Sequence, residues 1–278
     1  MFIIGGKEMR LDEIKERWKK SNLGNGEIEE RIWDRVSKEY YKMDVPDFET
    51  DPFLKLINNE FSITHEMNSL DIGCGTGRYS FAMAKKISHS VGIDLSGKMI
   101  EYARQIEKKL SYKNTDFYWK DWARVDIDEI GFRKAFDIVF AHMTPAISDY
   151  GSFEKMIACS RKYCIMEKHS RRTDSILDEV FGSIGLEKGT QSDEALIYIF
   201  ATLWNMGYSP KIQYRTQVHK SLKTREDMTA WSMDRAKLRK ELTAGEEEKM
   251  MQVIDSHTIS GMVEETMSST IVSIYWEV

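Results

Sequence analysis

The sequence contains few cysteines, and they form no recognisable metal site or disulfide framework. Its 278 residues include only Cys74, Cys159 and Cys164, and no two of these form a CxxC pair. An odd number of cysteines without metal-ligand spacing indicates reduced thiols, so we predict neither a bound metal nor a disulfide-stapled fold. Reduced thiols are typical of proteins in the cytoplasm.

Long apolar runs are also absent. Residues 1–6 place only three large apolar side chains after the initial methionine, which is too few for a signal peptide. No other stretch approaches the ~20 apolar residues that a membrane-spanning helix needs. These absences predict a cytoplasmic protein without a membrane partner.

An excess of positive charge is missing as well. The chain has 40 Lys and Arg residues against 45 Asp and Glu residues, and the formal net charge is −5. Acids and bases alternate in segments such as 101–109, a pattern typical of solvated helix faces. This balance argues against a large phosphate-binding surface, and therefore against DNA as a partner.

Strands and helices alternate in the middle of the chain. Buried strands are predicted at 67–72, 89–94, 115–119, 136–141 and 163–167, and helices at 77–87, 96–110 and 152–161. Ser96 is a candidate cap for the second of these helices. The alternation predicts a parallel sheet with helices on both faces and right-handed crossovers.

The two ends of the chain follow other patterns. Residues 7–44 are charged and place apolar side chains at helix-face spacing, and a short helix is predicted near 54–58. The C-terminal part predicts helices at 193–206, 225–240 and 245–257, and strands at 211–219 and 263–277.

The most informative segment is the glycine-rich stretch from Asp71 to Arg78, D-I-G-C-G-T-G-R. It follows a predicted strand, opens a predicted helix, and is followed about 20 residues later by Asp94 at the end of the next strand. Gly73, Gly75 and Gly77 allow backbone conformations and close approaches that a Cβ would block. A dinucleotide fingerprint would need glycine at position 78, so Arg78 disfavours NAD.

With its leading acid and three alternating glycines, this segment resembles the first motif of the class I, seven-stranded S-adenosylmethionine-dependent methyltransferases. The motifs of the resemblance cover 65–170, and element order extends it over the rest. It implies a doubly wound α/β fold: a mostly parallel seven-stranded sheet whose antiparallel last strand lies beside its predecessor. An N-terminal helical cap (1–62) and a methyltransferase core (63–278) complete the expected organisation.

The resemblance also implies a cofactor, S-adenosylmethionine, with S-adenosylhomocysteine as the product. The glycine loop would hold its methionine portion, and Asp71 would reach its amino group, often through water. Asp94 would accept hydrogen bonds from both ribose hydroxyls, although a helix N-cap is an alternative role. Leu95 and Met99 would flank the adenine, and core packing explains Met99 equally well.

Asp121 and Trp122 follow the third predicted strand, at the sheet edge where such folds bind ligands. In the resembled family, an acid at this point receives the adenine amino group, and the next backbone N–H meets a ring nitrogen. Asp116, Asp126 and Asp128 crowd the same region and compete for this role. Trp122 either shields the base or fills the interface between sheet and helix.

The segment that begins with Ala141 and His142 follows the fourth predicted strand, where the family places cofactor and methyl acceptor. His142 is the candidate general base, because imidazole exchanges protons near neutral pH; a histidine that only hydrogen-bonds the loop is the alternative. The segment is not the Asn/Asp-Pro-Pro-aromatic string of amino-methylating nucleic-acid enzymes, and the chain lacks the Pro-Cys nucleophile of cytosine C5 enzymes. Both differences count against methylation of bases.

Aromatic residues at both ends are candidates for the walls of the site. Tyr40 is predicted to contact the cofactor from the N-terminal cap; Trp33, seven residues earlier, shares its helix face, which also fits an ordinary packed stripe. The C-terminal additions offer either an apolar acceptor pocket or a hydrophobic core, built from Trp204, Met206, Tyr208, Trp231 and Met233.

The sequence therefore predicts methyl transfer to a small-molecule acceptor by in-line displacement, with residues 171–260 determining the acceptor. Two alternatives stay open: methylation of a protein or RNA, and a regulatory protein that binds S-adenosylmethionine without catalysis. A blocked or missing acceptor cavity would favour the regulatory protein, and a concave basic patch would favour RNA.

Overall fold

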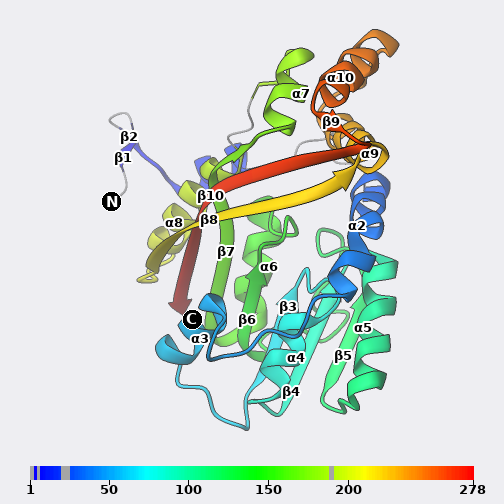
Figure 1. Ribbon diagram of the computed structural model, residues 1–278. Coiled ribbons are helices and arrows are strands. Elements are labelled where there is room, and N and C mark those ends of the chain that lie inside the picture. The colour runs from blue at the N-terminus through cyan, green and yellow to red at the C-terminus, as the bar shows by residue number, and fades with distance from the viewer. Residues whose placement is uncertain (1–2, 5–6, 20–25, 188–190) are drawn as a thin grey trace.

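The computed structural model describes residues 3–4, 7–19, 26–187 and 191–278. These form one central eight-stranded sheet with helices on both faces (Figure 1). Its strand order is β5-β4-β3-β6-β7-β10-β8, and β9 pairs with β10 off this path. The strands are β3 (Asn68–Ile72), β4 (His89–Asp94), β5 (Thr115–Trp119), β6 (Phe136–His142), β7 (Ser160–Asp174), β8 (Lys211–Thr224), β9 (Thr258–Ile259) and β10 (Met262–Glu277).

The direction of the strands confirms the predicted fold class. Strands β5, β4, β3, β6 and β7 pair in parallel, and β10 lies between β7 and β8, antiparallel to both. The antiparallel last strand thus lies beside its predecessor, β8, as the resemblance implied. Within the described residues, the two-residue strand β9 is the only addition to the seven strands predicted for this sheet.

Helices cover both faces of this sheet and extend beyond one end of it (Figure 1). Helices α5 and α6 begin at side-chain caps, and Ser96 is the predicted cap of α5, since its Oγ accepts from the Met99 N–H. The helices are α1 (Leu11–Arg17), α2 (Gly26–Tyr41), α3 (Pro52–Glu60), α4 (Arg78–Ala84), α5 (Gly97–Leu110), α6 (Tyr150–Cys159), α7 (Leu177–Ser183), α8 (Gln191–Asn205), α9 (Arg225–Lys237) and α10 (Ala244–Ser256). A short antiparallel pair, β1 (Ile3–Ile4) and β2 (Lys7–Glu8), precedes them.

Two hydrophobic cores lie on opposite faces of the sheet. Neighbouring residues of β6 show this division: Val139 packs with α6 and α8, whereas Phe140 packs with α3 and α4. Both side chains are completely buried, as expected for a central parallel strand. A third core joins α7, α9 and α10 beyond the end of the sheet, around Met228 and Ile254.

Two strands are much longer than their predicted ranges. The predicted strand at 163–167 is the centre of the 15-residue strand β7, and the strand predicted at 211–219 continues to Thr224 as β8. Both extensions pair with β10, so their partner lies far away in the sequence. The polar residues after Glu167 concealed the extension of β7, and helix α7 was not predicted at all.

The N-terminal segment does not form one compact layer. Helix α1 packs against α6 and α8, whereas α2 packs against α5 and α9. Of the N-terminal residues 1–6, whose composition predicts no signal peptide, residues 1–2 and 5–6 lie outside the described residues. Among the described residues, no helix combines the length and apolar character needed to cross a membrane.

Candidate functional site

A cavity of about 690 Å³ opens at the carboxyl ends of the parallel strands. It lies where the strand order reverses, between β3 and β6, which is the usual ligand position in open α/β sheets. The loops after β3, β4, β5 and β6 form one side, and α2 and β8 contribute to the rest. Most of the predicted site residues therefore line a single space.

The glycine loop turns sharply at the base of this cavity. Gly73, Gly75 and Gly77 all have positive φ, at 73°, 55° and 77°, a region that other residues rarely adopt. A Cβ on Gly73 would lie 2.0 Å from the Thr144 hydroxyl oxygen, and one on Gly77 would lie 2.6 Å from the Phe117 ring. Gly73 and Gly75 line the cavity, whereas Gly77 lies outside the lining and begins α4.

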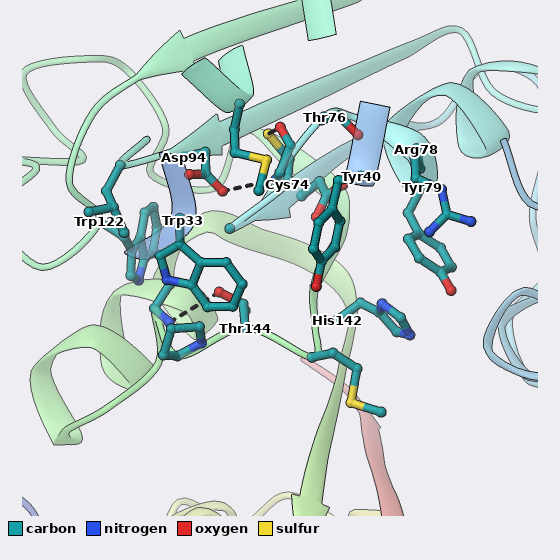
Figure 2. Close-up of a pocket in the computed structure, with 18 of the residues that line it drawn as sticks. Trp33, Tyr40, Cys74, Thr76, Arg78, Tyr79, Asp94, Trp122, His142 and Thr144 are labelled. Atoms are coloured by element: carbon teal, nitrogen blue, oxygen red, sulfur yellow. Dashed lines mark hydrogen bonds between the residues drawn. The ribbon is translucent and has the colours of Figure 1, made fainter. Parts of the chain in front are cut away.

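Asp94 fixes the loop to the end of β4. Its Oδ2 accepts the Gly75 N–H at 2.8 Å (Figure 2). Its Oδ1 accepts the Ser96 N–H, also at 2.8 Å. The N-cap of α5 is Ser96, so the alternative role of Asp94 as that cap is wrong. Burial raises the pKa of Asp94 to about 6, against the opposing effect of these backbone hydrogen bonds.

Two further polar groups lie at the loop. Asp71 is almost completely buried and accepts a hydrogen bond from the Ser80 hydroxyl at 2.8 Å, and burial raises its pKa to about 7. The hydroxyl of Thr76 is buried, lines the cavity, and has no hydrogen-bond partner among the described residues. A buried hydroxyl without a partner is costly, so this position fits a polar group of a bound molecule.

The four residues predicted to surround an adenine share one feature of the structure. Leu95, Met99, Asp121 and Trp122 all line the cavity. Asp121 accepts the Ala123 N–H at 2.9 Å and lies 3.5 Å from Arg124. Trp122 fills the interface between sheet and helix as well, because its ring is buried in the core and its Nε1 donates to the Ser152 carbonyl at 3.0 Å.

The competing acids at this edge have other partners. Asp116 pairs with His89, and Asp128 pairs with Arg133. Asp126 accepts the backbone N–H of Asp128 within its own turn. All three lie outside the cavity lining, which leaves Asp121 as the acid of this region that faces the cavity.

Helix α2 supplies the cap of the cavity. Trp33 and Tyr40 both line it, and their rings meet edge to face with centroids 6.4 Å apart (Figure 2). Arg31 and Arg35, on the same helix, hold Asp234 of α9 at 2.7 Å and 2.8 Å. The helix that carries both aromatic rings is thus held against α9 by ion pairs to a buried carboxylate.

His142 lies at the other end of the cavity, beyond the glycine loop (Figure 2). Its Nε2 is 3.2 Å from Oε2 of Glu167, and its ring packs on Tyr79 and Phe53 with centroids 4.0 Å and 4.6 Å away. The described residues offer no hydrogen-bond partner to Nδ1 of His142. The histidine therefore contacts a buried carboxylate and not only the loop backbone.

Glu167 is surrounded by donors. Besides His142, it contacts both terminal nitrogens of Arg215, with Nη2 at 2.8 Å, and the Ser273 hydroxyl at 2.6 Å. Burial alone would raise its pKa, but the interactions with His142 and Arg215 outweigh burial and hold the pKa at about 2. The carboxylate is therefore ionised throughout the physiological pH range.

The wall around His142 is polar. Of the two alternatives predicted for the C-terminal aromatic and methionine residues, the structure shows the hydrophobic core. The residues proposed for an apolar acceptor pocket are absent from the lining: Trp204 is exposed, and the others pack in hydrophobic cores. Ala141 is buried in a core and lies outside the lining as well. Polar residues that sequence reasoning missed take the place of the apolar pocket: Asp51, Tyr79, His169, Arg215, Gln217 and His219.

Glu167, which lies behind the cavity lining, is a further residue that sequence reasoning missed, and it carried a local signal. Glu167 closes the apolar run of a predicted strand, at the sheet edge where the site was expected. Arg215 and His219 lie in the polar strand β8 and are brought to the site by long-range pairing. Burial lowers the pKa of His169 to about 4, so its imidazole is neutral at pH 7.

Comparisons with known proteins agree with this geometry. A family model described as a methyltransferase domain matches residues 63–267. An uncharacterized protein of Haemophilus influenzae is 26% identical over 147 residues, 52% of each chain. The demethylmenaquinone methyltransferase of Staphylococcus aureus is 27% identical over 116 residues, 40% of this chain and 47% of that one. The chain thus spans about half the length of these curated relatives.

A solved structure shares the fold. The phosphoethanolamine N-methyltransferase 2 of Haemonchus contortus, in complex with phosphomonomethylethanolamine and S-adenosylhomocysteine, superposes with a TM-score of 0.53. The alignment covers 93% of this chain and 60% of that one at 11% identity. At this level of identity the likeness concerns the fold alone.

Proposed function

The chain belongs to the methyltransferase-domain family, as a class I domain that depends on S-adenosylmethionine, and we propose that it methylates a small polar molecule. The observation that carries the proposal is one continuous cavity, which joins the glycine loop to the polar wall around His142. When bound, S-adenosylmethionine supplies a methyl group on a positively charged sulfur that is already electrophilic. The chain's task is to position the two reactants in line, which contributes on the order of 7–11 kcal/mol.

The cofactor end of the cavity fits this molecule. Each carboxylate oxygen of Asp94 accepts one backbone N–H and retains a lone pair for a ribose hydroxyl. Gly73, Gly75 and the hydroxyl of Thr76 would face the methionine portion, and Asp71 would serve its amino group. Leu95, Met99, Asp121 and Trp122 would surround the adenine beneath the Tyr40 cap. We assign Gly77 and Ala141 to packing behind the site.

The acceptor end supports a small polar substrate. The whole cavity, about 690 Å³, lies in the usual range for small-molecule sites. Gln217 and His219 on its wall offer hydrogen-bonding groups, and Arg215 on the same strand is already paired with Glu167. A paired cation of this kind does not provide the basic concave patch that would favour RNA.

His142 is our proposed general base for an acceptor that arrives protonated. Glu167 favours the proton on Nε2 of His142, and this leaves Nδ1 to accept a proton from a hydroxyl or amine. General-base catalysis of this type contributes a factor of about 10² to 10⁴. An acceptor cavity that contains a base also argues against a regulatory protein without catalysis, for which a blocked or missing cavity was expected.

The first test is calorimetric titration with S-adenosylmethionine and S-adenosylhomocysteine, with NAD as the control ligand. We expect micromolar binding of the first two and its loss in Asp94→Ala, which removes the proposed ribose acceptor and one anchor of the loop. Asp128→Ala is the matched control, because Asp128 pairs with Arg133 outside the cavity lining. Binding of NAD, or of none of the three, would overturn the assignment.

The second test identifies the acceptor class. The protein is incubated with S-adenosylmethionine that carries a deuterated methyl group, in separate small-molecule, RNA and protein fractions of a cell extract. Mass spectrometry then locates the label. We expect it in the small-molecule fraction, reduced in His142→Ala, whereas labelled RNA or protein would contradict the proposed substrate class.

A further inference from the structure

Within the described residues, strand β8 is an edge of the sheet (Figure 1). It exposes a row of three apolar side chains. Tyr214, Val218 and Leu222 are 69%, 60% and 63% exposed. Their spacing of four residues places all three on one face of the strand. An edge strand also presents a row of unpaired backbone groups, so this 14-residue edge is a ready template for another strand.

The charges on β8 do not protect this edge. Proteins commonly place lysines on edge strands to prevent pairing with another chain. Every lysine and arginine of β8 instead lies within 4 Å of a carboxylate of its own chain. The pairs are Lys211 with Glu60 (2.8 Å), Arg215 with Glu167 (2.8 Å), Lys220 with Glu264 (3.6 Å) and Lys223 with Glu265 (2.6 Å).

We propose that β8 pairs antiparallel with β8 of a second copy of this chain, about a twofold axis at Val218. In this register Val218 faces its own counterpart, and Tyr214 faces Leu222 on both sides of the axis. All three exposed apolar side chains are then covered by apolar partners, which is the self-complementarity that a twofold interface requires. An axis at Thr216 would instead place Leu222 opposite Pro210, outside the strand.

The side chains on the opposite face of β8 are also compatible with this register. Arg215 meets Ser221, and Gln217 meets His219, so no like charges lie opposite each other between 212 and 224. Gln217 and His219 also line the cavity. Pairing therefore places the Gln217 and His219 side chains of the second copy next to the cavity wall, and dimerisation connects two acceptor sites through one continuous sheet.

The oligomeric state tests this proposal and does not depend on the reaction. Sedimentation velocity of the full chain across micromolar concentrations should show a dimer. Val218→Lys should be monomeric, because two lysines meet at the axis, and so should Val218→Glu; an equimolar mixture of the two variants should restore the dimer. Leu110→Lys, at an exposed apolar position on α5, is the control and should stay dimeric.

The register is tested by cysteine cross-linking. Val218→Cys should form a disulfide-linked dimer on mild oxidation, because the two side chains face each other at the axis. Thr216→Cys should not, since the two copies of position 216 stand about 13 Å apart along the strands. A wild-type monomer at all concentrations, a dimer that survives Val218→Lys, or cross-linking through position 216 instead of 218 would each overturn the proposal.

Discussion

His142 and Glu167 are register partners on the neighbouring parallel strands β6 and β7, and Nε2 of the histidine is 3.2 Å from Oε2 of the glutamate. The sheet itself therefore brings the imidazole and the carboxylate together. Arg215 and Ser273 reach the same carboxylate from β8 and β10. The group that orients the proposed base is thus held by four strands.

The first prediction concerns this pair. His142→Ala should lower kcat by about 10² to 10⁴ for a protonated acceptor, while cofactor affinity changes less than about twofold, because the imidazole would act on the acceptor only. The measurement is S-adenosylhomocysteine formation with the acceptor that the labelling experiment identifies. Activity that recovers at high pH would support a base role, and an unchanged kcat would contradict it.

Glu167→Gln tests how the base is oriented. The variant keeps the volume of the side chain but no longer favours the proton on Nε2 of His142, so we expect a lower kcat and an altered pH profile. Ser273→Ala is the matched control, because it removes another contact of the same carboxylate without touching the histidine. Identical pH profiles for Glu167→Gln and wild type would show that the carboxylate only supports the fold.

The second prediction follows from the buried carboxyl of Asp71. Its folded pKa, about 7, lies above the ordinary value of 3.8, so the folded protein loses stability as pH rises from about 4 to 7. Asp71→Asn removes this cost and should stabilise the protein without cofactor by up to about 4 kcal/mol at pH 8, with little gain near pH 4. Urea unfolding at both pH values measures the difference, and an equal gain at both would contradict the prediction.

The same variant should bind S-adenosylmethionine more weakly, because an amide replaces the charge that would face the cofactor's amino group. A stabilised protein with weaker binding would identify Asp71 as a residue kept for function at the expense of stability. Undiminished binding would remove Asp71 from the proposed site.

Local patterns were sufficient to predict two of the parallel strands. The predicted ranges of β4 and β5 match the structure, because each is a short run bounded by turn residues. The sequence likewise brought the glycine loop and Asp94 together at one sheet edge, since this geometry depends on residues close together in sequence.

The parts of the site that the sequence did not predict depend on pairing between segments far apart in the chain. Arg215 and Glu167 are 48 residues apart, and only the insertion of β10 between β7 and β8 brings them together. For a related reason, the sequence left open whether the C-terminal aromatic and methionine residues line an acceptor pocket or pack in a core. Trp231 and Met233 have the same local pattern whether their partner is a substrate or the core between α7, α9 and α10, and in the structure that partner is the core.

The third prediction separates backbone strain from steric clash. Gly73→Ala should cost more stability than Gly131→Ala, although both glycines have φ near 70°, because only at position 73 does a Cβ meet Thr144. We expect about 1–2 kcal/mol for Gly131→Ala, which carries the conformational cost alone. Thermal unfolding measures stability, and calorimetry should show that only Gly73→Ala loses cofactor binding; equal losses in the two variants would contradict the clash.

The last prediction concerns the ion pairs that hold helix α2 over the cavity. Asp234 holds Arg31 and Arg35 of α2, the helix that carries Trp33 and Tyr40 into the cavity. Asp234→Ala leaves both arginines without their carboxylate, so α2 should detach more readily and the cofactor's Kd should rise about tenfold, mostly through faster dissociation. Asp255→Ala is the matched control, since it removes an arginine partner from α9 without contacting α2. Stopped-flow dissociation of S-adenosylhomocysteine distinguishes the variants. Equal rates in Asp234→Ala and wild type would show that the cap is held by packing against α5, and not by its ionic anchor.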